Sequence, residues 1–544
     1  MVRVVWLLIL PLGWSCDLVS RVDDHRTGRL RAPVLAASRR DPGTLVVGRP
    51  RDAQSLDPAR VSDNESVEVC EQIYDTLLTY NPTTRRIEPG LAKSWDMSTD
   101  GRQWTFYLRD GVRFHDGAPL DADAVVFSFE RQRDPGHPFH VPDRTSLDFV
   151  YWQTSYRNVR RVEAIGRLTV RITIDAVYAP FEANMAMFPA AIVSPGSVAR
   201  AGADYYRHPV GTGPFRFVSW EGGRIVLERN PHYWGTPPAI DRLVFRAIPD
   251  ARQRLTELES AALDVAYSIP PDRLQFVELL PDLVVHQHSA LAVAYLAMNT
   301  THPPFDDVRV RRAINHAVNR DPIVKLAYQG LASPATGPLP PEQWGYHRSA
   351  IRYPYDPERA RVLLAEAAAA GRFDASRVYR LYAPASPRSY LPEPEVIARV
   401  LRANLAAVGI KTELVIQDIE QHDDSVEGGD HDLCLYGWVG DNGDPDNFLY
   451  TLFDQSNTRP GLAQNLAFFR DAELHDLLID AQRNVARTTR EGLYRRAQER
   501  IASQAPWVPL AHSRVAVAAR VNVDGISINP TNGVEFKRVR RLAH

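Results

Sequence analysis

The sequence has few cysteines and no excess of either charge. Only Cys16, Cys70 and Cys434 occur in 544 residues, too few for the disulfide framework of a small secreted domain. Cys434 lies in an apolar, strand-like run, where a buried free thiol is expected. Lys and Arg number 64 against 66 Asp and Glu, a net charge of −2. The charge balance therefore gives no reason to expect a nucleic acid or another polyanion as a partner.

The motifs of the common enzyme classes are also missing. The sequence contains no HExxH and no GxSxG, and the GTG at 211–213 is followed by Pro214 rather than by the Lys-Ser or Lys-Thr of a phosphate-binding loop. The 16 histidines are scattered, and none is spaced with a cysteine or carboxylate as metal ligands are. We therefore expect no catalytic residues, no cofactor and no metal.

A long apolar run lies among the first residues. Met1-Val-Arg3 is a short basic start, and Val4 to Leu12 is an apolar run with the length of a signal-peptide core. No later run approaches the roughly 20 apolar residues of a membrane helix. Export from the cytoplasm is therefore predicted.

The sequence LGWSC at 12–16 resembles the cleavage box of bacterial lipoproteins, with residues 1–16 as signal region and Cys16 as the lipidated residue. It departs from that box at Gly13, where an aliphatic residue is usual. The polar residues 17–42 would form a flexible tether whose ends lie roughly 25 to 30 Å apart. The alternative is cleavage near Val34-Leu-Ala36, which would leave an untethered protein.

The length predicts more than one domain, because single hydrophobic cores stop growing at about 250 to 300 residues. Strand and helix signals alternate from residue 44. Strands are predicted at 44–48, 104–108 and 168–174, and a hairpin at 215–228 with its turn at 221–224. A helix is predicted after the SDNE sequence at 62–65, which has the form of a capping box, and another at 121–131.

In the second half of the chain, residues typical of helix ends indicate where helices begin and end. Asp-Pro pairs at 321 and 356 begin two helices that Gly330 and Gly371 end, and a third helix at 393–408 precedes Gly409. Strands are predicted at 378–382, 412–416 and 433–438. This alternation is typical of α/β units, whereas the region 104–241 is richer in antiparallel hairpin signals.

The most informative segment follows the last of these strands. The apolar run 433–438 leads into a loop with three carboxylates, Asp441, Asp444 and Asp446. Ligands in open α/β sheets bind beyond the carboxyl ends of strands, so the loop predicts a site for a cation or an amine. A calcium loop is disfavoured, because counting from Asp441 the sixth and twelfth positions are Asp446 and Leu452 rather than Gly and Glu.

Two of the carboxylates have different expected roles. Asp444 precedes Pro445 and an apolar stretch, as an N-cap residue does before proline at the first helical position, so capping is favoured over ligand binding. Asp441 has no such structural role. It follows glycines that let other backbone approach closely.

Several segments in the same order resemble a family of bacterial extracellular solute-binding proteins that serve peptide and nickel ABC transporters. These segments are LAKSWDMSTDG (91–101), WTFYLRDGVRFHDG (104–117), AVVFSFER (124–131), PVGTGPF (209–215) and VRRAINHAVNR (310–320). The resemblance covers nearly the whole chain after residue 44.

The resemblance implies an α/β, two-lobed periplasmic-binding-protein (Venus flytrap) fold, with an extra domain in the N-terminal lobe and the ligand in the cleft between the lobes. We expect 43–85, 205–290 and 510–544 to form domain I, 86–204 an inserted domain II, and 291–509 domain III.

Within this family, GWVGDNGDPDNF at 437–448 is most similar to members that bind dipeptides. The resemblance implies that Asp441 pairs with the ligand α-ammonium and that Arg388, in the PRSY segment at 387–390, binds its carboxylate. The separation, 441 − 388 = 53 positions, is the one the resemblance requires. The chain departs from these members at Ser389, which replaces proline, and at 454–466, which lacks a cysteine pair.

Further contacts are implied by position. The resemblance adds ligand contacts from Ser389, Tyr390, Trp438, Val439 and Gly440. Ser62 falls where the family has a threonine near the ligand, and a role as helix N-cap is an equally good interpretation.

One Asp and one Arg suit a zwitterion whose charges lie about 7 Å apart in two extended residues, because a buried ion needs a partner. The expected function is the substrate-binding receptor of an ABC importer that captures dipeptides or short peptides and delivers them to a permease complex in the inner membrane. The alternatives within the fold are longer or antimicrobial peptides, haem, glutathione or a nickel chelate, and outside transport a sensory receptor. We expect a periplasmic or cell-envelope monomer, held to the membrane if Cys16 is lipidated.

Overall fold

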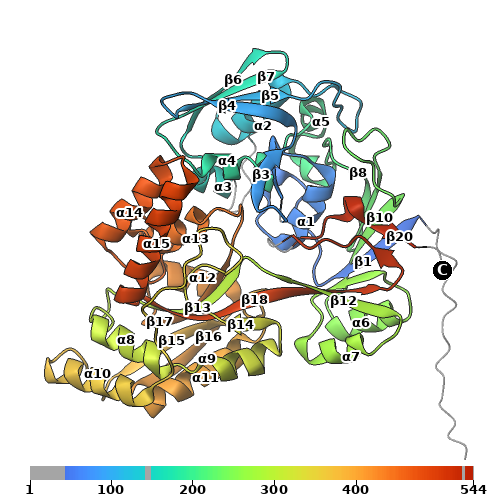
Figure 1. Cartoon of the computed structure of the whole chain (residues 1–544). Helices are drawn as coiled ribbons and strands as arrows, with labels where there is room; N and C mark the ends of the chain where they lie inside the picture. The colour runs from blue at the N-terminus through green and yellow to red at the C-terminus, as the bar shows by residue number, and fades with distance from the viewer. Residues whose placement is uncertain (1–42, 82, 141–148, 530–532, 543–544) are drawn as a thin grey trace, which may run out of the picture. The chain divides into compact units, whose positions relative to one another are not determined.

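The computed structural model (Figure 1) describes residues 43–81, 83–140, 149–529 and 533–542. The predicted signal region, Cys16 and the tether at 17–42 lie outside the described residues. Within the described part, no helix combines the length and the apolar composition needed to cross a lipid bilayer. Cys70 and Cys434 are buried free thiols, as predicted for Cys434.

A sheet of twelve strands connects both halves of the fold. Its order is β16-β15-β17-β13-β18-β11-β1-β10-β9-β8, with β12 and β14 also paired to β18. The strand β18 (Trp507–Arg520) joins the halves, because its first residues pair with β13 (Ala292–Met298) and its last residues pair with β11 (Val265–Tyr267) and β12 (Leu283–Ser289). Figure 1 shows it running between them.

In the C-terminal half, β15 (Val378–Pro384) lies parallel to β16 (Lys411–Gln417) and to β17 (Leu433–Val439), which confirms the three predicted strands. Apolar residues on the two faces of the sheet belong to two separate cores. One core includes α8 (Val308–Ala317), α10 (Pro357–Ala369) and α11 (Pro394–Ala407), and the other includes α13 (Asp446–Phe453), α14 (Ala472–Arg483) and α15 (Arg487–Gln504).

In the N-terminal half, β1 (Thr44–Arg49) pairs in parallel with β10 (Arg242–Ala247), and β8 (Phe215–Glu221) and β9 (Arg224–Arg229) form the predicted hairpin. The helix α1 (Asn64–Ile73) packs on one core of this half. The helices α6 (Ala251–Glu259) and α7 (Leu274–Glu278) contribute to another.

A separate antiparallel sheet has the order β4-β5-β7-β6 and its own core with α2 (Ala122–Arg133). Its strands are β4 (Ala92–Met97), β5 (Gln103–Leu108), β6 (Val159–Gly166) and β7 (Thr169–Ile174). It lies within the segment predicted as an inserted domain, whose boundaries stay a prediction. The remaining short elements include β2 (Leu78–Asn81), β3 (Arg86–Pro89), α3 (Val150–Thr154), α4 (Phe181–Asn184), α5 (Pro195–Ala201), α9 (Arg320–Ile323), β14 (Ala332–Pro334), α12 (Ile419–Gly428), β19 (Val523–Asp524) and β20 (Arg540–Arg541).

Two local predictions need correction. The N-cap of α1 is Asp63, whose carboxylate accepts from the Ser66 N–H at 2.9 Å, so the predicted cap at Ser62 is wrong by one residue. The helix predicted after residue 321 is present but irregular: α9 continues as a π-helical turn, Val324–Tyr328. It ends at Gln329, which is left-handed with φ 46°.

Candidate functional site

Two neighbouring parallel strands carry the two charged residues expected to bind a ligand. The register of β15 and β17 pairs Leu381 with Leu433 and Tyr382 with Cys434. Because parallel strands end at the same edge of a sheet, the segment after β15 and the loop after β17 leave from that same edge. Arg388 lies in the first segment and Asp441 in the second.

Asp441 is held in place by one amide side chain. The Asn447 Nδ2 donates to the Asp441 carboxylate at 3.1 Å, and the Asn447 Oδ1 accepts from the Asp441 N–H at 3.0 Å. The same oxygen accepts from the Trp438 indole Nε1 at 3.0 Å. Asn447 therefore fixes both the carboxylate and the half-buried indole beside it.

Burial controls the charge of Asp441. Desolvation raises its pKa to about 6, and the hydrogen bond from Asn447 offsets part of that effect. Among the described residues, no Lys, Arg or His forms an ion pair with this carboxylate. A cationic ligand would supply the missing partner.

Glycines let the strand and its loop come close to large rings. A Cβ on Gly437 would lie 2.2 Å from the Tyr390 ring, and one on Gly440 would lie 2.6 Å from the Phe448 ring. The Gly440 N–H also donates to the Leu291 carbonyl at 2.7 Å, which anchors the start of the loop. Glycine at 437 therefore lets Tyr390, two residues after Arg388, pack against β17, and glycine at 440 lets Phe448 pack against the start of the loop.

Arg388 lies in a tight turn and keeps donor capacity. Its backbone N–H donates to the Leu391 carbonyl at 2.8 Å, and its carbonyl accepts from the Leu391 N–H at 3.0 Å. Its Nε is buried and has no hydrogen-bond partner among the described residues. A buried unpaired guanidinium N–H is costly, so an anionic ligand would be stabilised here.

The electrostatic influence of Arg388 is visible in its neighbours. Burial raises the pKa of Asp423 and of Tyr390, the latter to about 12, and in both groups the Arg388 charge opposes that rise. The Tyr436 hydroxyl donates to Asp423 at 2.9 Å, and the Tyr390 and Tyr436 rings lie 6.2 Å apart. Tyr390 and Asp423 therefore lie close enough to Arg388 for its charge to affect them.

Residues in and just after α3, and one residue of α4, lie near Asp441 and its loop. The pKa values of Tyr151 and Tyr156 are raised, first by burial and then by the charge of Asp441. The Asn442 Nδ2 donates to the Asn184 Oδ1 at 2.6 Å. The place of Asn447 in the DPDNF motif is a signal that could have identified it. Nothing in the sequence connects Asp441 with Tyr151, Tyr156 or Asn184, which lie some 250 to 300 positions upstream.

The other two carboxylates of the loop have structural partners. Asp444 accepts from the Asp446 N–H at 3.0 Å and forms a buried ion pair with the Arg490 guanidinium at 2.6 Å. The N-cap of α13 is Pro445, so the predicted N-cap at Asp444 is wrong by one residue. Burial and the nearby Asp444 charge raise the pKa of Asp446 to about 7. The Tyr178 hydroxyl donates to Asp446 at 3.2 Å. The described residues contain no cluster of three or more His, Cys, Asp or Glu side chains suited to a metal.

The remaining predicted residues differ in exposure. Tyr390, Trp438 and Val439 are half-buried, Gly440 is buried, and Ser389 is exposed. Ser62 is exposed as well, and in the described part of the chain no hydrogen bond or ion pair joins it to the Arg388 or Asp441 segments. The structure therefore supports a site around β15 and β17, while the role of Ser62 stays a prediction.

Comparison with known proteins identifies the family. The model of the bacterial extracellular solute-binding proteins, family 5, matches residues 86–460. A di/tripeptide-binding protein 2 of Pseudomonas aeruginosa is 33% identical over 93% of this chain and 96% of its own length. A heme-binding protein A of Haemophilus influenzae is 35% identical over 93% of each chain.

A solved structure gives the same result for the fold. The periplasmic binding protein DppA of Helicobacter pylori, in complex with the peptide STSA, has a TM-score of 0.79 and 34% identity over 92% of this chain and 98% of that one. The predicted two-lobed α/β fold is confirmed. The chain belongs to the bacterial extracellular solute-binding proteins of family 5, so the prediction of a transport receptor rather than an enzyme is confirmed as well.

Proposed function

We propose that this protein binds dipeptides or other short peptides by their charged termini and delivers them to the permease of an ABC importer. The observation that carries the proposal is a pair of opposite charges on neighbouring strand ends. Asp441 has no cationic partner, and the Arg388 Nε is buried without a hydrogen-bond partner in the described part of the chain. The relatives named as di/tripeptide-binding proteins support it.

A peptide zwitterion matches this arrangement. Its α-ammonium would pair with Asp441 and its carboxylate with Arg388, whose planar fork can hold two oxygens at once. Desolvating either charge costs several kcal/mol unless a partner is present, so both termini are expected to contribute to affinity. The backbone and the two ends of the peptide would be recognised, while Trp438 and Tyr390 would provide broad apolar contact to side chains.

The proposed delivery step depends on closure of the two halves that β18 joins. The contacts from the Asp441 loop to α4 are made across the proposed cleft, and a ligand between them would favour the closed arrangement. A permease at the inner membrane would then receive the closed form. We propose domain I at 43–85, 205–290 and 510–544, domain II at 86–204 and domain III at 291–509, with Ser62, Ser389, Val439 and Gly440 as further ligand contacts. Lipidation of Cys16 stays a prediction.

The test is a thermal-shift screen of di-, tri- and tetrapeptides with free and blocked termini, because a ligand that binds only the folded form raises the melting temperature. Free short peptides should stabilise the protein. N-acetylated and C-amidated forms of the same peptides should not. Equal stabilisation by free and blocked peptides would contradict recognition of the termini.

Haem is the alternative cargo, since a relative of similar identity is named as a heme-binding protein. The same screen distinguishes the two. A melting-temperature increase with haem alone, and with no short peptide, would replace the proposed ligand while leaving the family unchanged.

A further inference from the structure

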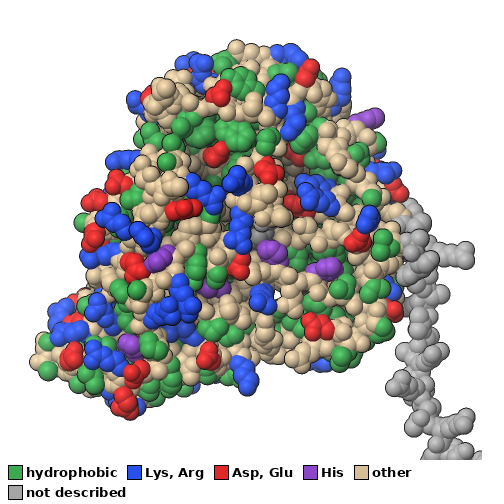
Figure 2. Space-filling view, in the orientation of Figure 1, with side chains coloured by type: hydrophobic (Ala, Val, Ile, Leu, Met, Phe, Trp, Pro, Cys, Tyr) green, Lys and Arg blue, Asp and Glu red, His purple; other side chains and the backbone are tan. Residues whose placement is uncertain are grey.

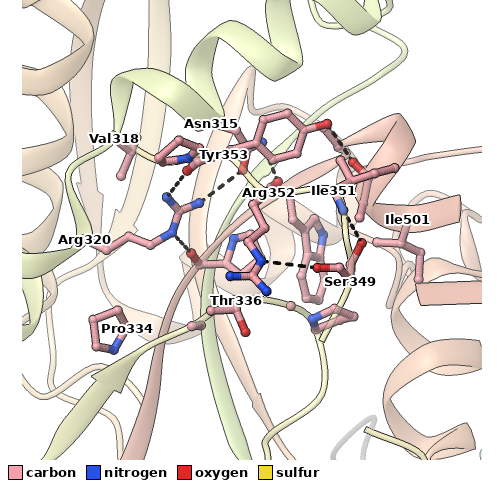
Figure 3. Close-up of a pocket in the computed structure, with 18 of the residues that line it drawn as sticks. Asn315, Val318, Arg320, Pro334, Thr336, Ser349, Ile351, Arg352, Tyr353 and Ile501 are labelled. Carbon is pink, nitrogen blue, oxygen red and sulfur yellow. Dashed lines mark hydrogen bonds between the residues drawn. The ribbon is translucent and has the colours of Figure 1, made fainter. Parts of the chain in front are cut away.

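A cavity lies in the C-terminal half of the fold, among residues other than the eight predicted for the peptide site. Its volume is about 360 Å³, within the range of cavities that bind small molecules. Its lining comes from the C-terminal end of α8, from α15, from the start of β18 and from the segment 334–355 (Figure 3).

The cavity exists because one edge of β18 lacks a neighbouring strand. Among the described strands, only β13 pairs with Trp507 and Pro509, while β14 pairs further along, from Ala511 to Ser513. Side chains satisfy the carbonyls that face this edge. The Asn315 Nδ2 donates to the Trp507 carbonyl at 2.8 Å, and the Arg320 Nε donates to the Pro509 carbonyl at 2.6 Å.

The guanidinium of Arg320 has only neutral partners. Besides Pro509, it donates to the Tyr353 carbonyl at 3.3 Å and to the Asn315 Oδ1 at 3.2 Å (Figure 3). No carboxylate forms an ion pair with it among the described residues. Burial lowers its pKa to about 10, and no charge offsets that effect. An arginine still carries its proton at neutral pH, so the cavity wall holds a desolvated cation without a counter-ion.

The other charged groups at the cavity do not neutralise Arg320. Arg352 is exposed, and its Nε reaches the Ser349 carbonyl only at 3.5 Å. His347 is paired with Glu499 at 2.7 Å. Asp321 is the one carboxylate in the lining, and it is exposed to solvent. Two arginines without carboxylate partners therefore face this space.

One part of the wall is apolar. Val318, Phe453, Ile501 and Trp507 line it and are each at most 5% exposed. Trp507 is held rigidly, because its ring stacks on Tyr295 with centroids 3.4 Å apart. Its indole Nε1 is buried and has no hydrogen-bond partner among the described residues.

We infer that this cavity binds a monocarboxylate with an apolar body, such as a medium-chain fatty acid. The carboxylate lies against Arg320 and Arg352, which supply the positive charge. The hydrocarbon lies along Val318, Phe453 and Trp507. The site is separate from the proposed peptide site and does not depend on it.

The test is isothermal titration of the whole protein with decanoate, below its micelle concentration, and with 1-decanol, which has the same chain and no charge. Decanoate should bind at least tenfold more tightly than 1-decanol. The Arg320→Met variant should lose at least tenfold in decanoate affinity. The matched control Arg348→Met removes an exposed arginine of the same segment, outside the lining, and should bind decanoate normally.

Two further variants keep the proposal testable if Arg320→Met does not fold. Thr336→Trp fills the cavity from an exposed position and should weaken decanoate tenfold or more, and Arg352→Met should weaken it less. Asp441→Ala should leave decanoate binding unchanged. No binding of decanoate at millimolar concentration, equal binding of acid and alcohol, or unchanged affinity in Thr336→Trp would each overturn the inference.

Discussion

Asp441 has a specific expected contribution to binding. If it pairs with the ligand α-ammonium, Asp441→Ala leaves that cation desolvated without a partner. We expect dipeptide binding to weaken by about 3 to 5 kcal/mol, as for a buried ion pair that loses one member. Isothermal titration with a free dipeptide measures this change.

The matched control is Asp430→Ala, which removes an exposed carboxylate upstream of the same strand. It should bind the dipeptide as the unmodified protein does. Near-normal affinity of Asp441→Ala would remove this residue from the site.

Asn447 is expected to act through Asp441. It holds the carboxylate and the Trp438 indole, and its hydrogen bond lowers the Asp441 pKa. In Asn447→Ala the carboxyl should titrate at higher pH and point less consistently at the ligand, with an affinity loss of about 1 to 2 kcal/mol. The measurement is dipeptide affinity between pH 5 and 8. A uniform loss at every pH, with no shift of the midpoint, would indicate a purely structural role.

At the scale of single residues, the sequence points to charged groups but not to the residues around them. Asp441 and Arg388 are predicted ligand contacts because their motifs resemble those of a known family. The SDNE pattern places the cap one residue too early, at Ser62, because it offers two adjacent capping side chains and only the backbone geometry selects Asp63. The sequence does not point to Tyr151 and Asn184, because contacts between residues more than 250 positions apart leave no local pattern.

The strand β17 should tolerate no side chain at Gly437. A Cβ there would lie 2.2 Å from the Tyr390 ring, which lies beside Arg388. Gly437→Ala should therefore displace Tyr390, lower the free energy of unfolding by about 1 to 3 kcal/mol, and weaken peptide binding. Chemical denaturation and titration measure the two effects.

Gly492 provides the control for this substitution. It lies within α15, and a Cβ there would meet no atom within 4 Å. Gly492→Ala should raise the free energy of unfolding by about 0.5 to 1 kcal/mol, because alanine favours the helix. A destabilised Gly492→Ala, or an unchanged Gly437→Ala, would contradict the packing described.

Among the helices and strands, the sequence predicts best those with a strong hydrophobic period or with residues typical of helix ends. The strands β15, β16 and β17 and the helices α10 and α11 lie where alternation, Asp-Pro starts and glycine ends placed them. The short helices α3 and α4 have too few residues to show a period. The role of β18 in joining both halves was also missed, because pairing partners more than 200 positions away leave no trace in one sequence.

At the scale of the whole molecule, the site is expected to lower the stability of the free protein. Burial raises the Asp441 pKa to about 6, from an unfolded value near 4. The folded form therefore binds more protons than the unfolded form between these values, and this group makes the protein less stable as pH rises through that window. Asp441→Asn, without ligand, should be more stable than the unmodified protein above pH 6 by about 2 to 3 kcal/mol.

The comparison with Asp441→Asn is needed because other groups titrate in the same range. Burial lowers the pKa of His422 and of His431 to about 4, which makes folding more favourable as pH rises. These effects are shared by both proteins and cancel in the difference. The stability difference measured by urea denaturation should vanish below about pH 4. A difference that is constant with pH would show that Asp441 has an ordinary pKa.

Peptide affinity should rise with pH in the window where the contribution of Asp441 to stability falls. Binding requires ionised Asp441 and a protonated ligand amine, whose pKa is about 8 in a free peptide. Affinity should therefore rise from pH 5 to above pH 6 and fall again above about pH 8, which titration across this range can measure. In Asp441→Asn the acid limb should disappear. An acid limb that persisted in Asp441→Asn would show that the carboxyl at 441 is not the group that receives the ligand amine.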